Sequence, residues 1–265
     1  MKLLEGKTAV VTGGGSGIGL GIAKRFAEEG AVVMICGRRE AALRQASSSI
    51  SKNGSNVYYS VADLTKEQDI KSLVQTVLSK IGGLDILVNC AGIMRYGKLD
   101  EVDFEDWHEQ MAINVYAPWR LMKEVTPHMR RKKGGSIVNI SSIAGNKAYP
   151  NAGVYCTTKA ALQSLSQVMA MELAADKIRI NMICPGMVEH TELVNPMIRP
   201  EDISSFYDRV RPLHPLGRSG TVDDIAGAAL FFASEESSWI TGAILPVDGG
   251  RHMATNRPEV KSSDG

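Results

Sequence analysis

Hydrophobic positions along the chain form short apolar runs that alternate with longer segments of helical period. The runs are rich in β-branched residues, and they predict strands at residues 8–12, 32–36, 57–61, 85–89, 136–140, 178–183 and 243–247. The longer segments predict helices over about residues 17–29, 40–51 and 66–79. Strands that are apolar throughout and separated by helices are typical of parallel sheets with both faces covered. The pattern therefore predicts an α/β fold, a doubly wound sheet of about seven parallel strands with helices on both faces.

This pattern continues without a linker, a repeat or a low-complexity tract, which favours one domain over residues 1–250. One long stretch, from about Pro185 to Thr221, carries five prolines and is predicted to be irregular. Irregular segments of this length in compact domains are often functional, so we expect a lid over about residues 187–220. Residues 251–265 are expected to form a polar C-terminal tail.

Charge and composition exclude several classes of partner. The formal net charge of +1 gives no global field that would attract nucleic acid or an anionic membrane. The basic run "RRKK" (130–133) is interpreted as the end of a helix, where cations complement the dipole, with a binding patch as the alternative. The N-terminal residues lack the apolar core of a signal peptide, and the apolar runs are too short to span a bilayer, so we expect a cytoplasmic protein. The four cysteines have no metal-ligand spacing, and no metal site is expected.

A glycine-rich turn, "TGGGSGIG" (12–19), follows the first predicted strand and precedes a predicted helix. Gly13, Gly17 and Gly19 have a G-x-x-x-G-x-G spacing, which allows a tight turn and close approach of a ligand to the backbone. The helix N-terminus beyond the turn offers unpaired N–H groups to a pyrophosphate. This context predicts dinucleotide binding.

The end of the second strand indicates which dinucleotide. An acidic residue there would bind the 2′-hydroxyl of the adenosine ribose and repel a 2′-phosphate, but Gly37 stands at this place. Arg38 and Arg39 follow, and guanidinium groups suit a phosphate. NADP(H) is therefore favoured over NAD(H), which stays open as the alternative, and two solvated arginines are the structural alternative.

The segment "VYCTTKAAL" (154–162) places Tyr155 and Lys159 four residues apart, on one face of a predicted helix. Together with "TGGGSGIG", "NCAG" (89–92), Asn114, "NISS" (139–142) and "PG" (185–186), this segment resembles the short-chain dehydrogenase/reductase family over essentially the whole chain. The resemblance implies a Rossmann-type fold and hydride transfer between a nicotinamide and an alcohol or ketone. It also implies a homotetramer, or a homodimer, with the helices around 114–131 and 155–173 between subunits.

Four residues carry the chemistry that this resemblance implies. Tyr155 would exchange a proton with the substrate oxygen, and Lys159 would help to lower the pKa of Tyr155. Ser142, with Ser141 as the competing choice, would hydrogen-bond the substrate oxygen. Asn114 would hold a water in a proton relay, although an asparagine near a helix start is also a common cap.

The same resemblance implies a set of cofactor contacts along the chain. In addition to Tyr155 and Lys159 they are Gly13, Ser16, Gly17, Ile18, Gly19, Arg38, Arg39, Asp63, Leu64, Asn89, Ala91, Gly92, Pro185, Gly186 and Val188. Two departures from the family pattern stand out. Cys90 replaces a second asparagine, and His190 occupies the place of a threonine that usually contacts the cofactor, with Thr191 next.

The expected substrate is a small-molecule alcohol or ketone of moderate size. The predicted pocket segments contribute mostly apolar side chains, and the full set is Met94, Ile143, Met187, Val188 and Met197 with Glu189 and His190 as polar exceptions. Hydroxysteroid-like, cyclic or polyketide-like carbonyls would suit such a pocket. The alternative enzyme is a 3-oxoacyl-acyl-carrier-protein reductase, and a catalytically silent dinucleotide-binding sensor is a minor alternative.

Overall fold

Seven parallel strands form one sheet in the spatial order β3-β2-β1-β4-β5-β6-β7. The structure, a computed structural model, describes residues 2–51, 56–193 and 198–254. The strands are β1 (Thr8–Thr12), β2 (Val32–Gly37), β3 (Val57–Val61), β4 (Ile86–Asn89), β5 (Gly135–Ile140), β6 (Ile178–Pro185) and β7 (Ile244–Val247). All seven predicted strands are present, and the predicted doubly wound fold is confirmed.

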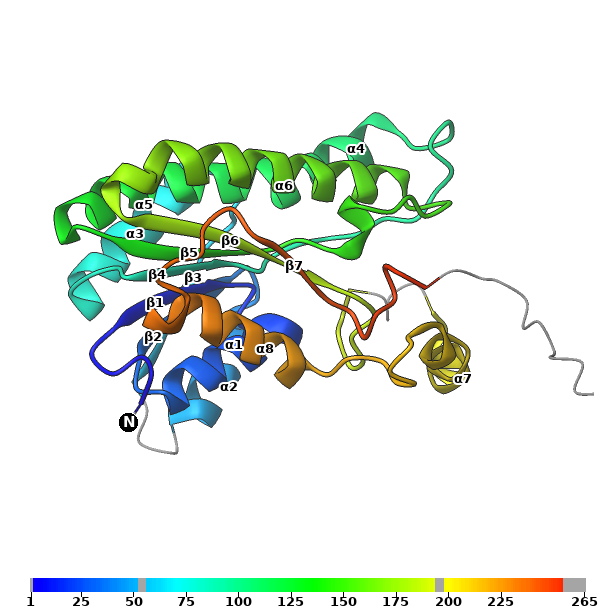
Figure 1. Ribbon diagram of the computed structural model, residues 1–265, viewed down its shortest axis with the longest axis horizontal. Coiled ribbons are helices and arrows are strands. Elements are labelled where there is room, and N and C mark those ends of the chain that lie inside the picture. Colours follow the sequence, from blue (N-terminus) through cyan, green and yellow to red (C-terminus); the bar gives the residue numbers. More distant parts are fainter. Residues whose placement is uncertain (1, 52–55, 194–197, 255–265) are drawn as a thin grey trace, which may run out of the picture.

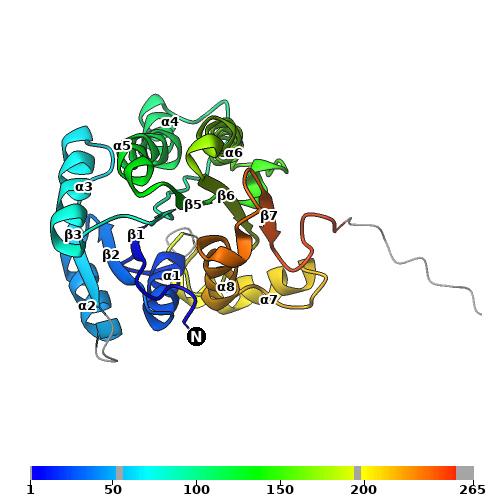
Figure 2. The same ribbon diagram turned by 60° about the vertical axis from the view of Figure 1, so that its left-hand side comes forward.

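Helices cover both faces of this sheet (Figures 1 and 2). One layer contains α1 (Gly17–Glu28), α2 (Glu40–Ser51) and α8 (Val222–Ala233), and the other contains α3 (Glu67–Ile81), α4 (Phe104–Met111), α5 (Ala117–Lys132) and α6 (Gly153–Leu173). Each layer buries its own apolar cluster against the sheet, with Phe26 and Phe232 in the first and Leu73 and Met122 in the second. Strands that are apolar on both faces are what this arrangement requires.

The strand order reverses between β1 and β4. The chain proceeds outward through β2 and β3 and then returns to pair β4 with the free side of β1, with Val10 beside Leu87. A crevice forms at the carboxyl ends of the strands where such a reversal occurs, because the connections leave in opposite directions. The glycine-rich turn after β1 lies at this crevice.

The segment predicted to be irregular between Pro185 and Thr221 contains helix α7 (Ile203–Val210). A short 3₁₀ turn begins at Pro200 and leads into the helix, because proline suits the first helical position. Tyr207 and Val210 are buried, and they anchor the helix. The prediction of irregular structure was therefore wrong for this part, because five prolines in the surrounding stretch obscured a two-turn helix.

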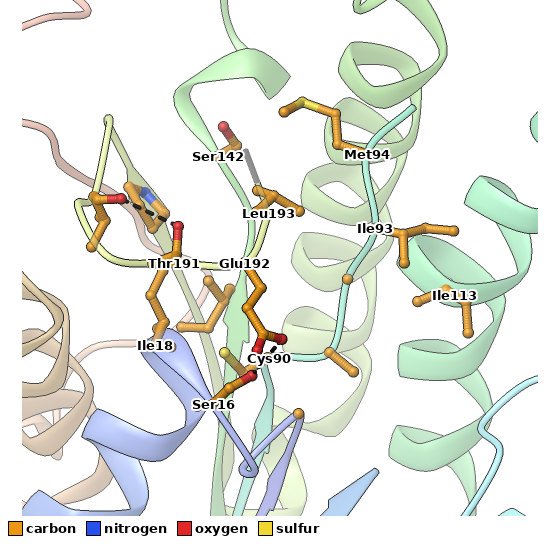
Figure 3. A pocket seen from close by; sticks show the side chains of 18 of the residues that line it. Ser16, Ile18, Cys90, Ile93, Met94, Ile113, Ser142, Thr191, Glu192 and Leu193 are labelled. Carbon is orange, nitrogen blue, oxygen red and sulfur yellow. Dashed lines mark hydrogen bonds between the residues drawn. The ribbon is translucent and has the colours of Figure 1, made fainter. Parts of the chain in front are cut away.

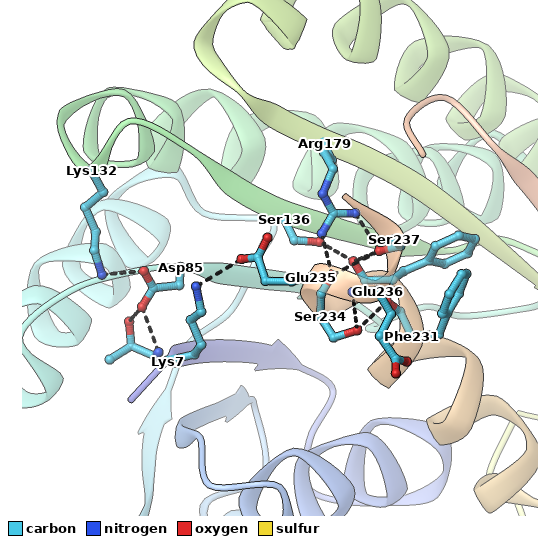
Figure 4. A network of polar contacts seen from close by, with 12 residues as sticks. Lys7, Asp85, Lys132, Ser136, Arg179, Phe231, Ser234, Glu235, Glu236 and Ser237 are labelled. Atoms are coloured by element: carbon cyan, nitrogen blue, oxygen red, sulfur yellow. Dashed lines mark hydrogen bonds and ion pairs between the residues drawn. The ribbon is translucent and has the colours of Figure 1, made fainter. Parts of the chain in front are cut away.

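Polar contacts stabilise the amino ends of the central strands, opposite the crevice (Figure 4). The Asp85 carboxylate accepts hydrogen bonds from the backbone N–H and the hydroxyl of Thr8, at 2.8 and 2.7 Å, and pairs with Lys132. Arg130 donates to Asp176 at 2.7 Å. Lys132 therefore fastens the end of α5 to the start of β4, and Arg130 fastens it to the 3₁₀ turn η3 (Ala174–Asp176) after α6, which supports the interpretation of the run as a helix end.

No helix in the described part of the chain is long and apolar enough to cross a membrane.

Candidate active site

A cavity of about 800 Å³ opens at the carboxyl ends of the central strands (Figure 3). Its walls come from the glycine-rich turn, the ends of β2, β4, β5 and β6, the start of α6 and the first residues of segment 187–220, which was predicted to be a lid and keeps that name below. Most of the predicted cofactor residues line it, namely Gly13, Ser16, Gly17, Ile18, Gly19, Arg38, Arg39, Leu64, Ala91, Gly92, Pro185, Gly186 and Val188. Ser142, Tyr155 and Lys159 line the same cavity. The fold therefore joins the predicted cofactor half and the predicted reacting groups in one space.

Gly13 and Gly19 of the turn are each required for a different physical reason. Gly13 has a φ of +68°, and a Cβ there would lie 3.1 Å from the Cα of Ala91. A Cβ at Gly19 would collide with the backbone carbonyl oxygen of Gly13. The turn is thus tight at Gly13 and Gly19, where no side chain fits, as close approach of a pyrophosphate requires. These residues fit a dinucleotide cofactor.

Tyr155 and Lys159 lie one turn apart on α6 and are both buried, with exposures of 6% and 4%. The Lys159 Nζ lies 5.5 Å from the centroid of the Tyr155 ring and donates a hydrogen bond of 2.9 Å to the carbonyl oxygen of Ile140, at the end of β5. Burial lowers the pKa of Lys159 to about 8. Helix α6 and strand β5 together hold the ammonium beside the phenol.

Burial raises the pKa of Tyr155, and a hydrogen-bonding interaction with Ser142 lowers it by less. The contacts within the protein do not by themselves lower the pKa of this phenol, because desolvation outweighs them. The predicted lowering also depends on the positive nicotinamide of the oxidised cofactor, and it stays a prediction. The Tyr155 phenol therefore keeps its proton at neutral pH.

Ser141 and Ser142 both line the cavity, but their hydroxyls have different partners. The Ser141 Oγ donates to the carbonyl oxygen of Lys159 at 3.2 Å and accepts from Gln163 at 3.2 Å. The Ser142 Oγ accepts a hydrogen bond from the backbone N–H of Ala144 and interacts with Tyr155. Of the two serines, Ser142 is the one next to the reacting phenol.

Asn114 lies in η1 (Ala112–Tyr116), a π-helical segment that joins α4 to α5 without a break. Its Oδ1 accepts from the backbone N–H of Ile93 at 2.9 Å, and its Nδ2 donates to the Ile93 carbonyl at 2.9 Å and to Thr158 at 3.0 Å. The alternative of a helix cap is therefore wrong, because the residue lies inside a continuous helical segment. A π-turn re-aims a side chain, and here it directs the amide towards the cavity wall at Ile93.

The lid begins with a turn in which one residue is displaced outward. His190 has a φ of +59°, and its side chain is 90% exposed. Thr191 is buried, lines the cavity and lies beside Gly17. The left-handed turn thus directs the His190 side chain outward, and Thr191, the next residue, faces the cavity.

The expectation that Glu189 and His190 line the pocket is therefore wrong. The Glu189 carboxylate faces away from the cavity and accepts two hydrogen bonds from Arg211, at 2.8 and 3.2 Å. Met94, Ile143, Met187 and Val188 do line the cavity as predicted. Met197 lies outside the described residues.

Two predicted cofactor residues do not reach the cavity. The Asp63 carboxylate accepts from the backbone N–H and the hydroxyl of Thr65, at 3.1 and 2.8 Å, while its neighbour Leu64 lines the wall. Asn89 is buried in β4 and donates to Asn139 at 2.7 Å. In each case the next residue, Leu64 or Cys90, lines the cavity instead. The Asp63 carboxylate is held by Thr65 and by the exposed Lys66, whereas the Asn89 carboxamide points into the protein interior.

Glu192 and Leu193, which follow Thr191, also line the cavity, although neither was predicted (Figure 3). Cys90 lines it too, and burial raises the pKa of its thiol to about 12, so it remains protonated. Glu192 could have been suspected only from its position two residues after His190, since no local pattern marks it.

Known proteins resemble this chain over nearly its full length. A family model described as Enoyl-(Acyl carrier protein) reductase matches residues 13–252. The 3-oxoacyl-(acyl-carrier-protein) reductase FabG of Chlamydia muridarum is 39% identical over 252 residues, which cover 94% of this chain and 98% of that protein.

Solved structures show the same similarity. A gluconate 5-dehydrogenase from Burkholderia cenocepacia in complex with NADP and tartrate is 34% identical with a TM-score of 0.88, covering 95% of this chain and 97% of that one. A 7α-hydroxysteroid dehydrogenase complexed with NADH and 7-oxo glycochenodeoxycholic acid is 35% identical, also with a TM-score of 0.88, covering 93% of this chain and 94% of that one.

Proposed function

The chain belongs to the short-chain dehydrogenase/reductase family, and on that premise we propose that it transfers a hydride between NADP(H) and a secondary alcohol or ketone. One observation carries the proposal. Tyr155, Lys159 and Ser142 line the same cavity as the tight glycine turn, so a reacting carbonyl and a dinucleotide would meet there. When bound, the reduced nicotinamide supplies the hydride.

Tyr155 acts as the proton donor in the direction of reduction. Its raised pKa keeps the phenol protonated at neutral pH, which suits an acid that protonates a developing alkoxide. Lys159, with a pKa near 8, is mostly protonated at the same pH and stabilises the phenolate that remains. The hydrogen bond to Ile140 keeps the ammonium in position throughout.

Ser142 and Asn114 complete the proposed catalytic group with Tyr155 and Lys159. Ser142 hydrogen-bonds the substrate oxygen and orients it towards the phenol, a role that its place beside Tyr155 supports. The Oδ1 of Asn114 and the Nζ of Lys159 both approach Gly92, where an added Cβ would lie 3.3 and 3.6 Å from them. This proximity supports Asn114 as the residue that holds a water in a proton relay to Lys159.

NADP(H) is the proposed cofactor because Arg38 and Arg39 line the cavity where Gly37 leaves no acidic side chain. The two solved neighbours contain NADP and NADH respectively, so both cofactors occur among similar proteins. Replacing Arg38 with aspartate should move the preference towards NAD(H), because a carboxylate there repels a 2′-phosphate. An unchanged ratio of kcat/KM values for NADPH and NADH would contradict this assignment.

The proposed substrate is a carbonyl compound of moderate size and mostly apolar character. Met94, Ile113, Ile143, Met187 and Leu193 line the substrate half of the cavity. A hydroxysteroid-like, cyclic or polyketide-like carbonyl fits such walls.

A second candidate, reduction of a 3-oxoacyl group on acyl-carrier protein, is favoured by the 39% identity to the reductase of that name. The contacts of Lys132 with Asp85 and of Arg130 with Asp176 count against it, because they leave less of the basic run for an acidic carrier. Carrier-linked and free ketones therefore discriminate the two candidates.

The test is oxidation of NADPH and NADH by the purified protein against steroid, cyclic, acyclic and carrier-linked ketones. Turnover of a free ketone with NADPH supports the proposal, and turnover restricted to the carrier-linked ketone supports the second candidate. Binding of cofactor without turnover of any ketone would contradict both.

We propose a homotetramer as the assembly. Large apolar side chains are exposed on the two helices expected between subunits, including Trp119 on α5, 40% exposed, and Met171 on α6, 73% exposed. Exposed large apolar side chains of this kind are typical of interaction surfaces. Light scattering on the wild type and on Met171→Glu tests the proposal: a tetrameric mass that falls in the variant supports it, and a monomeric wild type refutes it.

A further inference from the structure

A carboxylate from the lid lies in the cofactor half of the cavity (Figure 3). Glu192 forms a bidentate ion pair with Arg39, with Nη2–Oε2 at 2.5 Å and Nη1–Oε1 at 3.2 Å. The Ser16 hydroxyl donates to the same carboxylate at 3.1 Å and accepts from Arg39 at 3.1 Å. These contacts bridge residues more than 150 positions apart in the chain and join the lid to the glycine turn and the end of β2.

The geometry shows that Ser16 and Arg39 form an anion site. Ser16 is the N-cap residue of α1, yet its side chain makes no capping bond to that helix. Its hydroxyl points instead to Glu192, at a helix end whose partial positive charge favours an anion. The hydrogen bond with Arg39 also lowers the pKa of Glu192, so the carboxylate is ionised at neutral pH.

We propose that Glu192 is a specificity-determining residue, whose carboxylate competes with the 2′-phosphate of NADP(H) for Arg39 and Ser16. The inference rests on the proposed function, which places the adenosine end of the cofactor at these residues. A 2′-phosphate carries up to two negative charges and needs a guanidinium partner, whereas the 2′-hydroxyl of NAD(H) is neutral. Glu192 therefore weakens the binding of NADP(H) more than that of NAD(H).

The size of the effect follows from the exposure of the pair. The Arg39 and Glu192 side chains are 60% and 57% exposed, so solvent screens the attraction. Measured exposed ion pairs of good geometry correspond to a change of about fivefold in an equilibrium constant. Removing the competing charge should thus strengthen binding of a 2′-phosphorylated nucleotide about fivefold.

Calorimetric titration of the full-length protein with two nucleotides tests this inference. Adenosine 2′,5′-bisphosphate carries the 2′-phosphate, and 5′-AMP lacks it. For Glu192→Gln, the ratio of the two affinities should move about fivefold towards the bisphosphate. Glu201→Gln, which removes an exposed carboxylate elsewhere on the lid, is the matched control and should keep the wild-type ratio.

A double-mutant cycle separates competition from a general structural effect. In an Arg39→Gln background, Glu192→Gln should produce a clearly smaller gain for the bisphosphate, because the contested guanidinium is absent and only the Ser16 hydroxyl remains. A gain of the same size in both backgrounds would overturn the inference.

Other outcomes are equally decisive. Weaker binding of both nucleotides by Glu192→Gln would overturn the inference and show that the carboxylate closes over the bound nucleotide. An unchanged affinity ratio would overturn the inference alone and leave the proposed function standing. Failure of the wild type to bind either nucleotide would overturn the proposed function and the inference with it.

Discussion

Replacing Lys159 with methionine should raise the stability of the protein while it lowers the activity. The side chain is almost completely buried, and burial moves its pKa from 10.5 to about 8. Because of this lowered pKa, the protonated Lys159 side chain reduces the free energy of unfolding at about pH 7 by about 3 kcal/mol. Methionine has a similar length and carries no charge, so it removes this cost.

The gain is partly offset by a lost hydrogen bond. The Lys159 Nζ donates to the carbonyl of Ile140, and leaving that acceptor without its partner costs about 1–3 kcal/mol. We therefore expect Lys159→Met to be about 1 kcal/mol more stable than the wild type at about pH 7. Turnover should nevertheless fall by about two orders of magnitude or more, because the phenolate of Tyr155 loses its stabilising charge.

The stability difference should depend on pH in a defined direction. Below about pH 8 both folded and unfolded Lys159 hold the proton, so the cost is fully present. Between about pH 8 and 10.5 the folded protein releases a proton that the unfolded chain retains, so wild-type stability rises with pH. The advantage of the variant should therefore shrink and then reverse as pH rises through this window.

Urea unfolding followed by tryptophan fluorescence at about pH 7 and about pH 9.5 measures both effects. Lys80→Met, at an exposed position on α3, is the control and should change stability by less than about 0.5 kcal/mol at either pH. A Lys159→Met variant less stable than wild type by more than about 2 kcal/mol at neutral pH, or a difference independent of pH, would refute the reasoning.

Three further substitutions test separate parts of the account. Tyr155→Phe should lower kcat by at least about 100-fold while NADPH binding, followed by its fluorescence, stays unchanged, and retained turnover would contradict the role of the phenol. Gly19→Ala should weaken NADPH binding at least about tenfold, because the added Cβ would collide with the backbone of Gly13. The control Gly227→Ala, on α8 with open space around it, should leave NADPH binding unchanged and add about 0.5–1 kcal/mol of stability. Equal NADPH affinities of the two variants would contradict the steric argument. Asp224→Asn should cost about 1–2 kcal/mol at neutral pH through loss of a capping box. The bond from Arg218 depresses the pKa of Asp224, so the wild type should lose the same stability as pH falls below about 4, and an acid-insensitive difference would contradict this assignment.

Local patterns in the sequence predicted the sheet and the glycine turn because each depends on neighbouring residues. Apolar runs of five or six residues predicted the positions of β1 to β7 within two residues at every end. Gly13 and Gly19 were recognised from their spacing, and the backbone contacts at both explain why glycine is required. The i, i+4 spacing of Tyr155 and Lys159 likewise predicted a shared helix face.

Features that depend on the path of a loop could not be predicted in this way. The left-handed turn at His190 decides that Thr191 faces the cavity, and histidine, although enriched in that conformation, adopts it too seldom for the sequence to predict it. The pairing of Glu192 with Arg39 joins segments 153 positions apart, so no local pattern indicates it. The pKa of Tyr155 also depends on burial by several elements, which the sequence does not show.

Transfer of an isotopic label tests the central claim most directly. The purified protein would be incubated with a ketone substrate and NADPH that carries deuterium on the transferred position of the nicotinamide, and the alcohol product would be examined by mass spectrometry. The account predicts that wild type places one deuterium on the carbinol carbon and that Tyr155→Phe, with cofactor bound, forms almost no labelled alcohol. Labelled alcohol formed equally by both proteins would contradict the assigned acid, and an alcohol without deuterium would contradict hydride transfer itself.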